Sequence, residues 1–194
     1  MLTFLLLPRF RLWPRQTILP TTREQLLFVF SYANLSNRQN DGKRGPRGFD
    51  GGKRIKGRKR FILVDTLGLL LKVIVTEASV GERDGAAWLL LAIVGLFQRL
   101  QVVWADGGYA GVDFVAWVLR HVGLRLEIIE RDPSMKGFQP LPRRWVVERT
   151  FAWFGNARRL SKDYEYHLQS SEAMIYATMI RIMLRRLATL ETTP

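Results

Sequence analysis

The chain contains no cysteine and only two histidines, His121 and His167, among its 194 residues. Disulfides and thiolate metal sites are therefore excluded, and a zinc site built from histidines is not expected. A metal ion would have to be bound by carboxylates, which are the ligands that Mg²⁺ and Mn²⁺ prefer. The lack of cysteine also fits a reducing compartment.

Long hydrophobic runs are also lacking. The longest apolar run beyond the start of the chain, residues 86–97, is too short to cross a bilayer. The apolar start, residues 1–7, is interrupted by Pro8 and Arg9 and does not have the order of a signal peptide. We therefore expect a cytoplasmic protein that does not insert into a membrane.

Acidic residues are scarce relative to basic ones, with 17 Asp plus Glu against 30 Lys plus Arg and a net charge of +13. This imbalance favours a polyanionic partner, with nucleic acid ahead of an anionic membrane surface. Nine of the eighteen residues 43–60 are Lys or Arg, interleaved with glycine. Such a run predicts either a solvated flexible arm or an arm that contacts phosphates.

The apolar pattern predicts an α/β fold. A β-hairpin is expected over residues 60–66 and 69–76, and further strands over 100–105 and 124–129. Helices are expected over 85–99, 111–121, 143–160 and 171–190. These elements pack most economically as a mixed sheet flanked by helices on both faces. Residues 1–42 predict an irregular N-terminal segment, within which 25–32 fit either a strand or a short helix.

The candidate site centres on Asp106, which ends the apolar strand and precedes a glycine-rich turn. The carboxyl end of a buried strand is where α/β proteins bind ligands and metals, although an Asp here could also brace the turn. A metal would need a second carboxylate near Asp106. The candidates are Asp65, Glu77, Glu82, Asp84, Asp113, Glu127, Glu130, Asp132 and Glu148.

Glu148 is the carboxylate with the most suggestive context, because Arg144 and Arg149 neighbour it on a predicted helix. It fits a metal ligand among phosphate-binding guanidinium groups, or equally one half of a surface ion pair. Asp65 fits a turn better than a site. Two-metal phosphoryl transfer would combine these carboxylates with the basic surface. Trp145 and Trp153, at helical spacing, fit core packing better than base stacking.

Three segments together resemble bacterial insertion-sequence transposases of the DDE group, of the insertion-sequence-five type. They are GPRGFDGGKRIKGRKRFILVDTLGLLLKVIVTEASVGERDGA, VVWADGGYAG and KGFQPLPRRWVVERTFAWFGNARRLSKDYE. The resemblance implies that residues 43–190 form an RNase H-like catalytic domain. It further implies Mg²⁺- or Mn²⁺-dependent cleavage and strand transfer of DNA at transposon ends, by a protein that is nucleoid-associated when bound and can form a homo-oligomer.

The resemblance also assigns residues to roles. Asp106 corresponds to the second catalytic Asp and Glu148 to the catalytic Glu, and both would be metal ligands. Basic residues of the arm and of the helix around Glu148 would contact DNA. These are Lys53, Arg54, Lys56, Arg58, Lys59, Arg60, Arg143, Arg144, Arg149, Arg158 and Arg159.

One part of the family pattern is absent. The first catalytic Asp lies in an Asp-Ser-Gln-Ser-Val-Lys-like segment shortly before the basic stretch, and residues 33–38 (ANLSNR) occupy that place, with Asn34 at or near the expected position. Codons for residues 33–37 can read Gln-Ser-Val-Lys in another frame. We therefore hypothesise that residues 1–42 are out of frame, that the N-terminal DNA-binding region is lost, and that the first strand is missing or replaced.

This departure predicts a truncated DDE transposase with impaired activity. An alternative is a non-catalytic DNA-binding remnant of a transposase. A further alternative is an unrelated metal-dependent nuclease that uses Asp65 together with Asp106 and Glu148.

Overall fold

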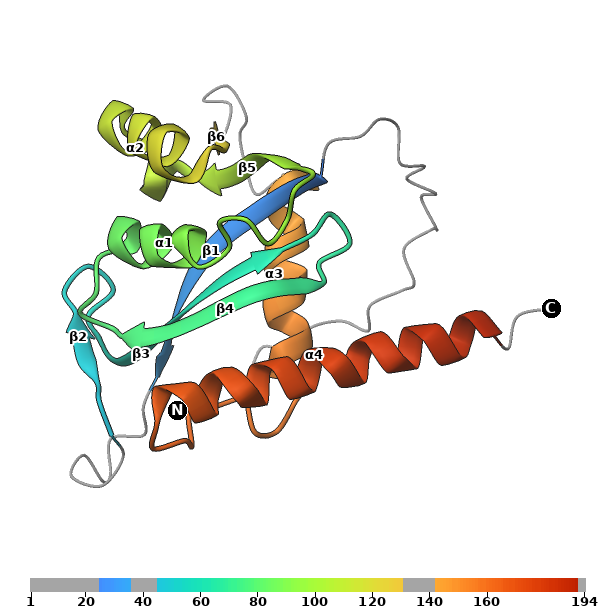
Figure 1. Cartoon of the computed structure of the whole chain (residues 1–194). Helices are drawn as coiled ribbons and strands as arrows, with labels where there is room; N and C mark the ends of the chain where they lie inside the picture. Colours follow the sequence, from blue (N-terminus) through green and yellow to red (C-terminus); the bar gives the residue numbers. More distant parts are fainter. Residues whose placement is uncertain (1–24, 36–44, 131–141, 192–194) are drawn as a thin grey trace, which may run out of the picture.

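The computed structural model describes residues 25–35, 45–130 and 142–191. These residues form one six-stranded mixed sheet with helices on both faces (Figure 1). The strands are β1 (Gln25–Leu35), β2 (Gly48–Asp50), β3 (Ile55–Val64), β4 (Leu70–Glu77), β5 (Leu100–Asp106) and β6 (Arg125–Ile129). The helices are α1 (Glu82–Leu91), α2 (Val112–Val122), α3 (Pro142–Gly155) and α4 (Leu168–Glu191), with a short 3₁₀ turn, η1, at Gly107–Tyr109.

The centre of the sheet is β1, which lies between β3 and β5. It pairs antiparallel with β3 and parallel with β5, and β5 pairs parallel with β6. On the other side, β3 also pairs antiparallel with β4 and, at its start, with β2. Residues 25–32, for which the pattern fits a strand or a helix, thus belong to a strand. The predicted mixed sheet is confirmed, and its order is compatible with an RNase H-like fold.

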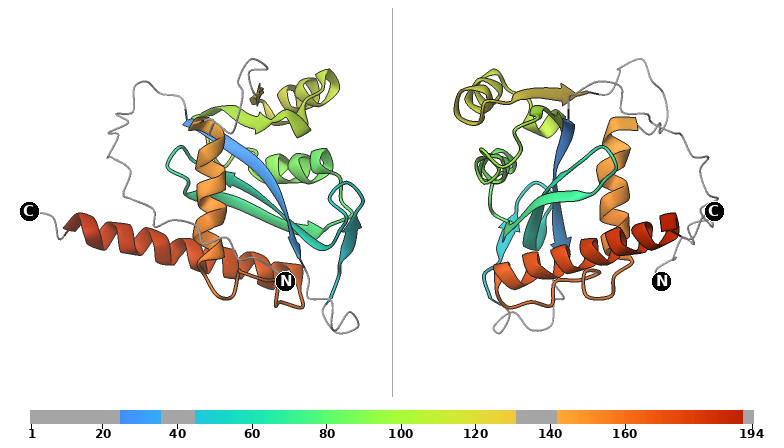
Figure 2. Two further views of the ribbon diagram at one scale, coloured as in Figure 1. Left: turned by 180° about the vertical axis from the view of Figure 1, so that it is seen from behind. Right: turned by 45° about the vertical axis from the view of Figure 1, so that its right-hand side comes forward.

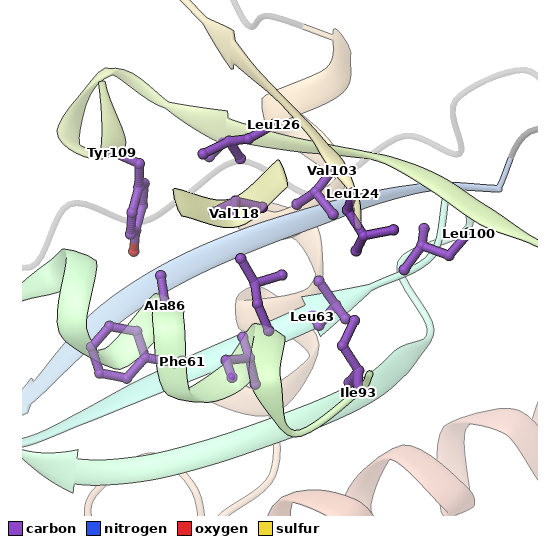
Figure 3. Close-up of a cluster of buried hydrophobic side chains, with 13 residues drawn as sticks. Phe61, Leu63, Ala86, Ile93, Leu100, Val103, Tyr109, Val118, Leu124 and Leu126 are labelled. Atoms are coloured by element: carbon purple, nitrogen blue, oxygen red, sulfur yellow. The ribbon is translucent and has the colours of Figure 1, made fainter. Parts of the chain in front are cut away.

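The two faces of the sheet each have their own hydrophobic core. Side chains alternate along a strand, so Phe61 and Leu63 of β3 face α1 and α2, whereas Ile62 and Val64 face α3 and α4. Figure 3 shows the first core, in which Tyr109 from η1 points toward Ala86 and Phe61. Both faces of β3 and β5 are therefore covered, which explains their continuous apolar runs.

The second core holds α3 and α4 against the opposite face (Figure 2). Val147, Thr150 and Phe154 of α3 are fully or almost fully buried, and their spacing of three and four residues gives one face of a helix. From α4, Ile175 and Met179 are buried one turn apart. The loop between the two helices lets α4 run across the sheet, where it contacts β4.

Some element boundaries differ from those predicted. The helix expected over 85–99 ends at Leu91, because residues 92–97 form turns in which Gly95 adopts a left-handed conformation with φ of 78°. The helix expected over 143–160 ends at Gly155. Conversely, β3 begins at Ile55, five residues before the predicted strand. In the part of the chain that the structure describes, no helix is both long and apolar enough to cross a membrane.

Candidate carboxylate site and basic surface

Asp106 is the last residue of β5, and its side chain also caps the following turn. Its Oδ1 accepts a hydrogen bond from the backbone N–H of Gly108 at 3.0 Å. The two functions proposed for this Asp, bracing the turn and facing a ligand, are therefore compatible, since one carboxylate oxygen serves the turn. Asp106 is partly exposed at the sheet edge.

A second carboxylate, Glu82, lies close to this turn. A Cβ atom on Gly108 would lie 2.7 Å from Glu82 Oε2 and 3.2 Å from Asp106 Oδ1. A larger residue at this position would therefore displace the Glu82 side chain. Glu82 Oε1 also pairs with Lys53 Nζ at 3.4 Å. This exposed pair contributes little stability, but it places the tip of the basic arm beside the Asp106 turn.

Glu148 lies on α3, and strand alternation along β5 predicts that the Asp106 side chain is directed toward the same face of the sheet. On β5, Val102 and Trp104 belong to the core under α3 and α4, and strand alternation gives Asp106 the same direction. Glu148 is half-buried and follows Val147, which packs on the sheet. Helix α3 contacts β1, the strand next to β5. The two carboxylates predicted to act together are thus expected to share a face.

The residues in place do not complete a metal site. Among residues 25–35, 45–130 and 142–191, no group of three or more His, Asp or Glu side chains could hold an ion. Asp106 and Glu148 provide the oxygen atoms that a hard cation prefers, but these two carboxylates alone do not surround an ion. We therefore derive no reaction step through a metal.

Strand β1, one of the two neighbours of β5, supplies no carboxylate. The eleven residues of β1, QLLFVFSYANL, include no Asp or Glu. Val29 of β1 pairs with Ala105, and Asn34 is paired with Arg58 at the other end of the strand. Asn34 is thus about 16 Å along the strand from Val29, at about 3.3 Å per residue. In this register Asn34 does not lie beside Asp106.

Half of the basic arm is buried, which removes three of the residues predicted to contact DNA. Arg58, Lys59 and Arg60 are 1%, 5% and 4% exposed. Strand β3 pairs with strands on both sides and is covered on both faces. Its side chains are therefore buried whichever face of the sheet they point to. The expectation that these three bind phosphates is corrected, since no phosphate can reach them in this fold.

Each buried cation has internal partners instead. Arg58 forms an ion pair with Asp163 at 3.0 Å and also donates to the carbonyls of Pro46 and Glu165. Lys59 pairs with Asp50 at 3.0 Å, and Arg60 donates to the carbonyl of Leu160. Buried charges need such partners. The arm therefore links β3 to the α3–α4 connection.

The other end of the arm remains exposed. Lys53, Arg54 and Lys56 lie in the turn between β2 and β3 or just after it. The Asp50 carboxylate organises this turn by accepting from the N–H groups of Gly52 and Lys53, both at 3.0 Å. These bonds and Lys59 hold the pKa of Asp50 below its ordinary value, the Lys53 N–H contributing most, although burial opposes the change.

Arg158 and Arg159, beyond α3, are exposed as well, and Arg159 pairs with Glu165 at 2.6 Å. Arg149 is only half-exposed, and its guanidinium group donates to the carbonyl of Leu67 at 3.0 Å. The side chains of Arg143 and Arg144 lie outside the part of the chain whose side chains are described.

Asp65 forms a turn, as its sequence context predicts. Its Oδ1 accepts from the N–H groups of Leu67 and Leu69 at 2.9 and 2.8 Å. Burial raises the pKa of Asp65, and these two N–H groups and Arg186 oppose the rise. The Asp65 carboxylate therefore serves this turn.

The mixed sheet, with Asp106 at the end of β5, matches a known class. Residues 16–183 match the family model described as the transposase DDE domain, so the chain belongs to this family. A protein of Burkholderia cepacia assigned as a transposase of insertion sequence element IS402 is 33% identical over 137 residues. The match covers 67% of this chain and 63% of that relative.

Sequence reasoning did not include three arginines of α4, Arg181, Arg185 and Arg186, among the candidate residues. Trp153 lies between helices α3 and α4, with the guanidinium carbons of Arg149 and Arg186 5.1 and 4.4 Å from its ring centroid. Arg181 and Arg185 lie nearby on α4. The sequence does contain a signal for this group. The segment between Glu172 and Glu191 has three arginines and no acidic residue.

Proposed function

We propose that this chain is a DNA-binding DDE transposase domain whose catalytic activity is impaired. The ancestral reaction is metal-dependent cleavage and strand transfer of DNA phosphodiesters at insertion-sequence ends, with Asp106 and Glu148 as ligands of Mg²⁺ or Mn²⁺. Exposed Lys53, Arg54 and Lys56 contact the DNA backbone, together with Arg143, Arg144, Arg149, Arg158 and Arg159. A non-catalytic remnant that only binds DNA is the alternative.

One observation carries the impairment. Of the two strands beside β5, the central strand β1 has no carboxylate in its eleven residues, and the β6 residue paired with Asp106 is Ile129. A two-metal reaction needs carboxylates on both sides of the ions so that the attacking and leaving oxygens are stabilised together. Family membership supports DNA as the partner, and the net charge of +13 supports contact with its backbone.

DNA binding is tested by fluorescence anisotropy with a short labelled duplex over a range of salt concentrations. We expect binding that weakens steeply with salt, since each neutralised phosphate contributes about 0.9 to the slope of log K against log salt. The double variant Arg54→Gln/Lys56→Gln should lose about 2 from this slope. The matched control is Arg99→Gln/Arg120→Gln, which removes the same charge from exposed positions elsewhere.

Catalysis is tested on supercoiled plasmids that carry candidate insertion-sequence ends, with Mg²⁺ or Mn²⁺ added. The expected result is binding without nicking. Metal-dependent nicking that disappears in both Asp106→Asn and Glu148→Gln would show an active transposase and contradict the impairment. Absence of binding at low salt would contradict the proposed function itself.

A further inference from the structure

A groove of about 640 Å³ runs between α3 and α4, on the face of the sheet opposite α1 and α2. Figures 1 and 2 show the long helix α4 crossing below the end of α3. Among the residues that line the groove are Trp153, Asn156 and Thr178, and the arginines at 181, 185 and 186. Among the described residues that line it there is no Asp or Glu. The groove is therefore a positively charged channel with neutral hydrogen-bonding groups beside the cations.

Arg186 and Arg149 are held against an aromatic ring rather than freely mobile. Arg186 lies over the ring of Trp153 at 4.4 Å, and Arg149 lies over the same ring at 5.1 Å. Cation–π contacts of this kind orient guanidinium groups. Arg181 and Arg185 are one turn apart on α4 and exposed, so they project in the same direction. Preorganised cations lose less entropy when they bind an anion.

The cations also lie close enough to disfavour one another. Burial lowers the pKa of Arg149, and the neighbouring charge of Arg186 lowers it further. Burial likewise lowers the pKa of Arg186, and the single nearby carboxylate, Asp65, works against this change. A bound anion would relieve the repulsion that one carboxylate offsets only in part.

We propose that the α3–α4 groove binds a phosphodiester backbone of DNA, as a contact surface separate from the basic arm. The inference deepens the proposed function and rests on it. The lining residues Thr178, Arg181, Arg185 and Thr189 extend over twelve residues of α4, or about 16 Å of helix at 1.5 Å per residue. This length corresponds to about five phosphates along one strand of a duplex.

The contact is to the backbone and not to bases. A base would need a free aromatic face for stacking, but the Trp153 ring already carries two guanidinium groups. Arginine matches phosphate geometry with two parallel hydrogen bonds. The side chains of Asn156 and Thr178 can add neutral bonds to phosphate oxygens. The groove therefore positions DNA without reading its sequence.

The first test compares two double variants of the full chain in the anisotropy assay. Arg181→Gln/Arg185→Gln should weaken binding about tenfold or more near 0.1 M salt and lower the salt slope by about 2. Arg99→Gln/Arg120→Gln is the matched control, with the same loss of charge from exposed positions outside the groove. Equal losses of DNA affinity in the two variants would overturn the proposal that the groove binds DNA and leave the proposed function intact. Failure of the unmodified chain to bind would overturn both.

The second test leaves the charge of the groove unchanged. Because the chain has no cysteine, a single Thr189→Cys substitution accepts a photo-crosslinker at the groove alone. We expect salt-sensitive crosslinks to duplex DNA from this position. A crosslinker at exposed Gln98, through Gln98→Cys, should give none under the same conditions. Equal crosslinking from both positions would overturn the proposal.

Discussion

At the scale of single residues, burial decides what a charge can do. Arg58 is as basic as Lys56, two residues earlier, but Arg58 is 1% exposed whereas Lys56 is exposed. Composition cannot separate the two, since the partners of Arg58 are Pro46, Asp163 and Glu165, up to about a hundred residues away along the chain. The sequence pattern therefore predicted a uniform basic arm, and the structure divides it.

Replacing Arg58 should destabilise the fold. Arg58→Ala leaves Asp163, itself 6% exposed, without its counter-ion, and breaking such a buried pair costs about 3–5 kcal/mol. Arg58→Lys should recover only part of this, since lysine cannot reproduce the several bonds of the guanidinium group. The measurement is the free energy of unfolding from denaturant titration. Lys56→Ala is the control, with an expected change within about 0.5 kcal/mol.

Asp50 should make stability depend on acid pH. Its pKa is lower in the fold than its ordinary value of 3.8. The stabilisation is therefore fully present above pH 3.8 and is lost as the pH falls through the folded-state pKa. Asp50→Asn should unfold more easily than the unmodified chain at neutral pH, and this difference should shrink in acid. A difference that stays constant down to low pH would contradict the role of the charged carboxylate.

At the scale of elements, apolar periodicity predicted the type and position of several helices and strands. It did not predict where each strand begins and ends. The hairpin of β3 and β4, strand β5 and helix α2 lie where the pattern predicts them, because their apolar residues repeat at the period of each element. The central strand β1 was harder to predict, since its eleven residues lie within a segment that shows no repeating pattern elsewhere. Its partners, β3 and β5, come later in the chain.

For the candidate site, too, the features set by local sequence were predictable and those set by long-range packing were not. The strand end at Asp106 and the basic context of Glu148 both follow from local sequence, and the structure confirms that Asp106 ends β5 and that Glu148 lies on a helix. The pairing register of β1 cannot be read locally, and it decides which β1 residue lies beside the end of β5, where Val29 pairs with Ala105. The proximity of Glu82 to Gly108 likewise depends on how α1 packs against η1.

The packing of α1 on the sheet should depend on Gly85. A Cβ at this position would lie 2.1 Å from the ring of Phe61, so Gly85→Ala must displace a buried aromatic ring. Such overpacking costs about 1–3 kcal/mol. Gly155→Ala is the matched control, because a Cβ there meets no atom within 4 Å, and alanine should stabilise the chain by about 0.4–1 kcal/mol. Denaturant titration of both variants measures the contrast, and equal effects would contradict the packing.

At the scale of the whole molecule, charge and hydrophobic packing are divided between surface and interior. Two apolar cores, one on each face of the sheet, hold the fold together. The excess of cations lies outside them, apart from the paired cations of β3. A high net charge destabilises the compact state through self-repulsion, so a polyanion that binds the surface should also stabilise the fold by mass action. Homo-oligomer formation stays a prediction at this scale.

Divalent metal should have little effect on this stability, because Asp106 and Glu148 do not belong to any described group of three ligands. A site with a Kd of about 10 µM would add about 2.7 kcal/mol at 1 mM Mn²⁺, which raises the melting temperature of a chain of this size by about 5–10 °C. We expect a shift of less than about 1 °C in thermal melts with 1 mM Mn²⁺, relative to EDTA. A large shift that Glu148→Gln removes would mean that a third ligand completes the site, and with it the impairment of catalysis would no longer follow.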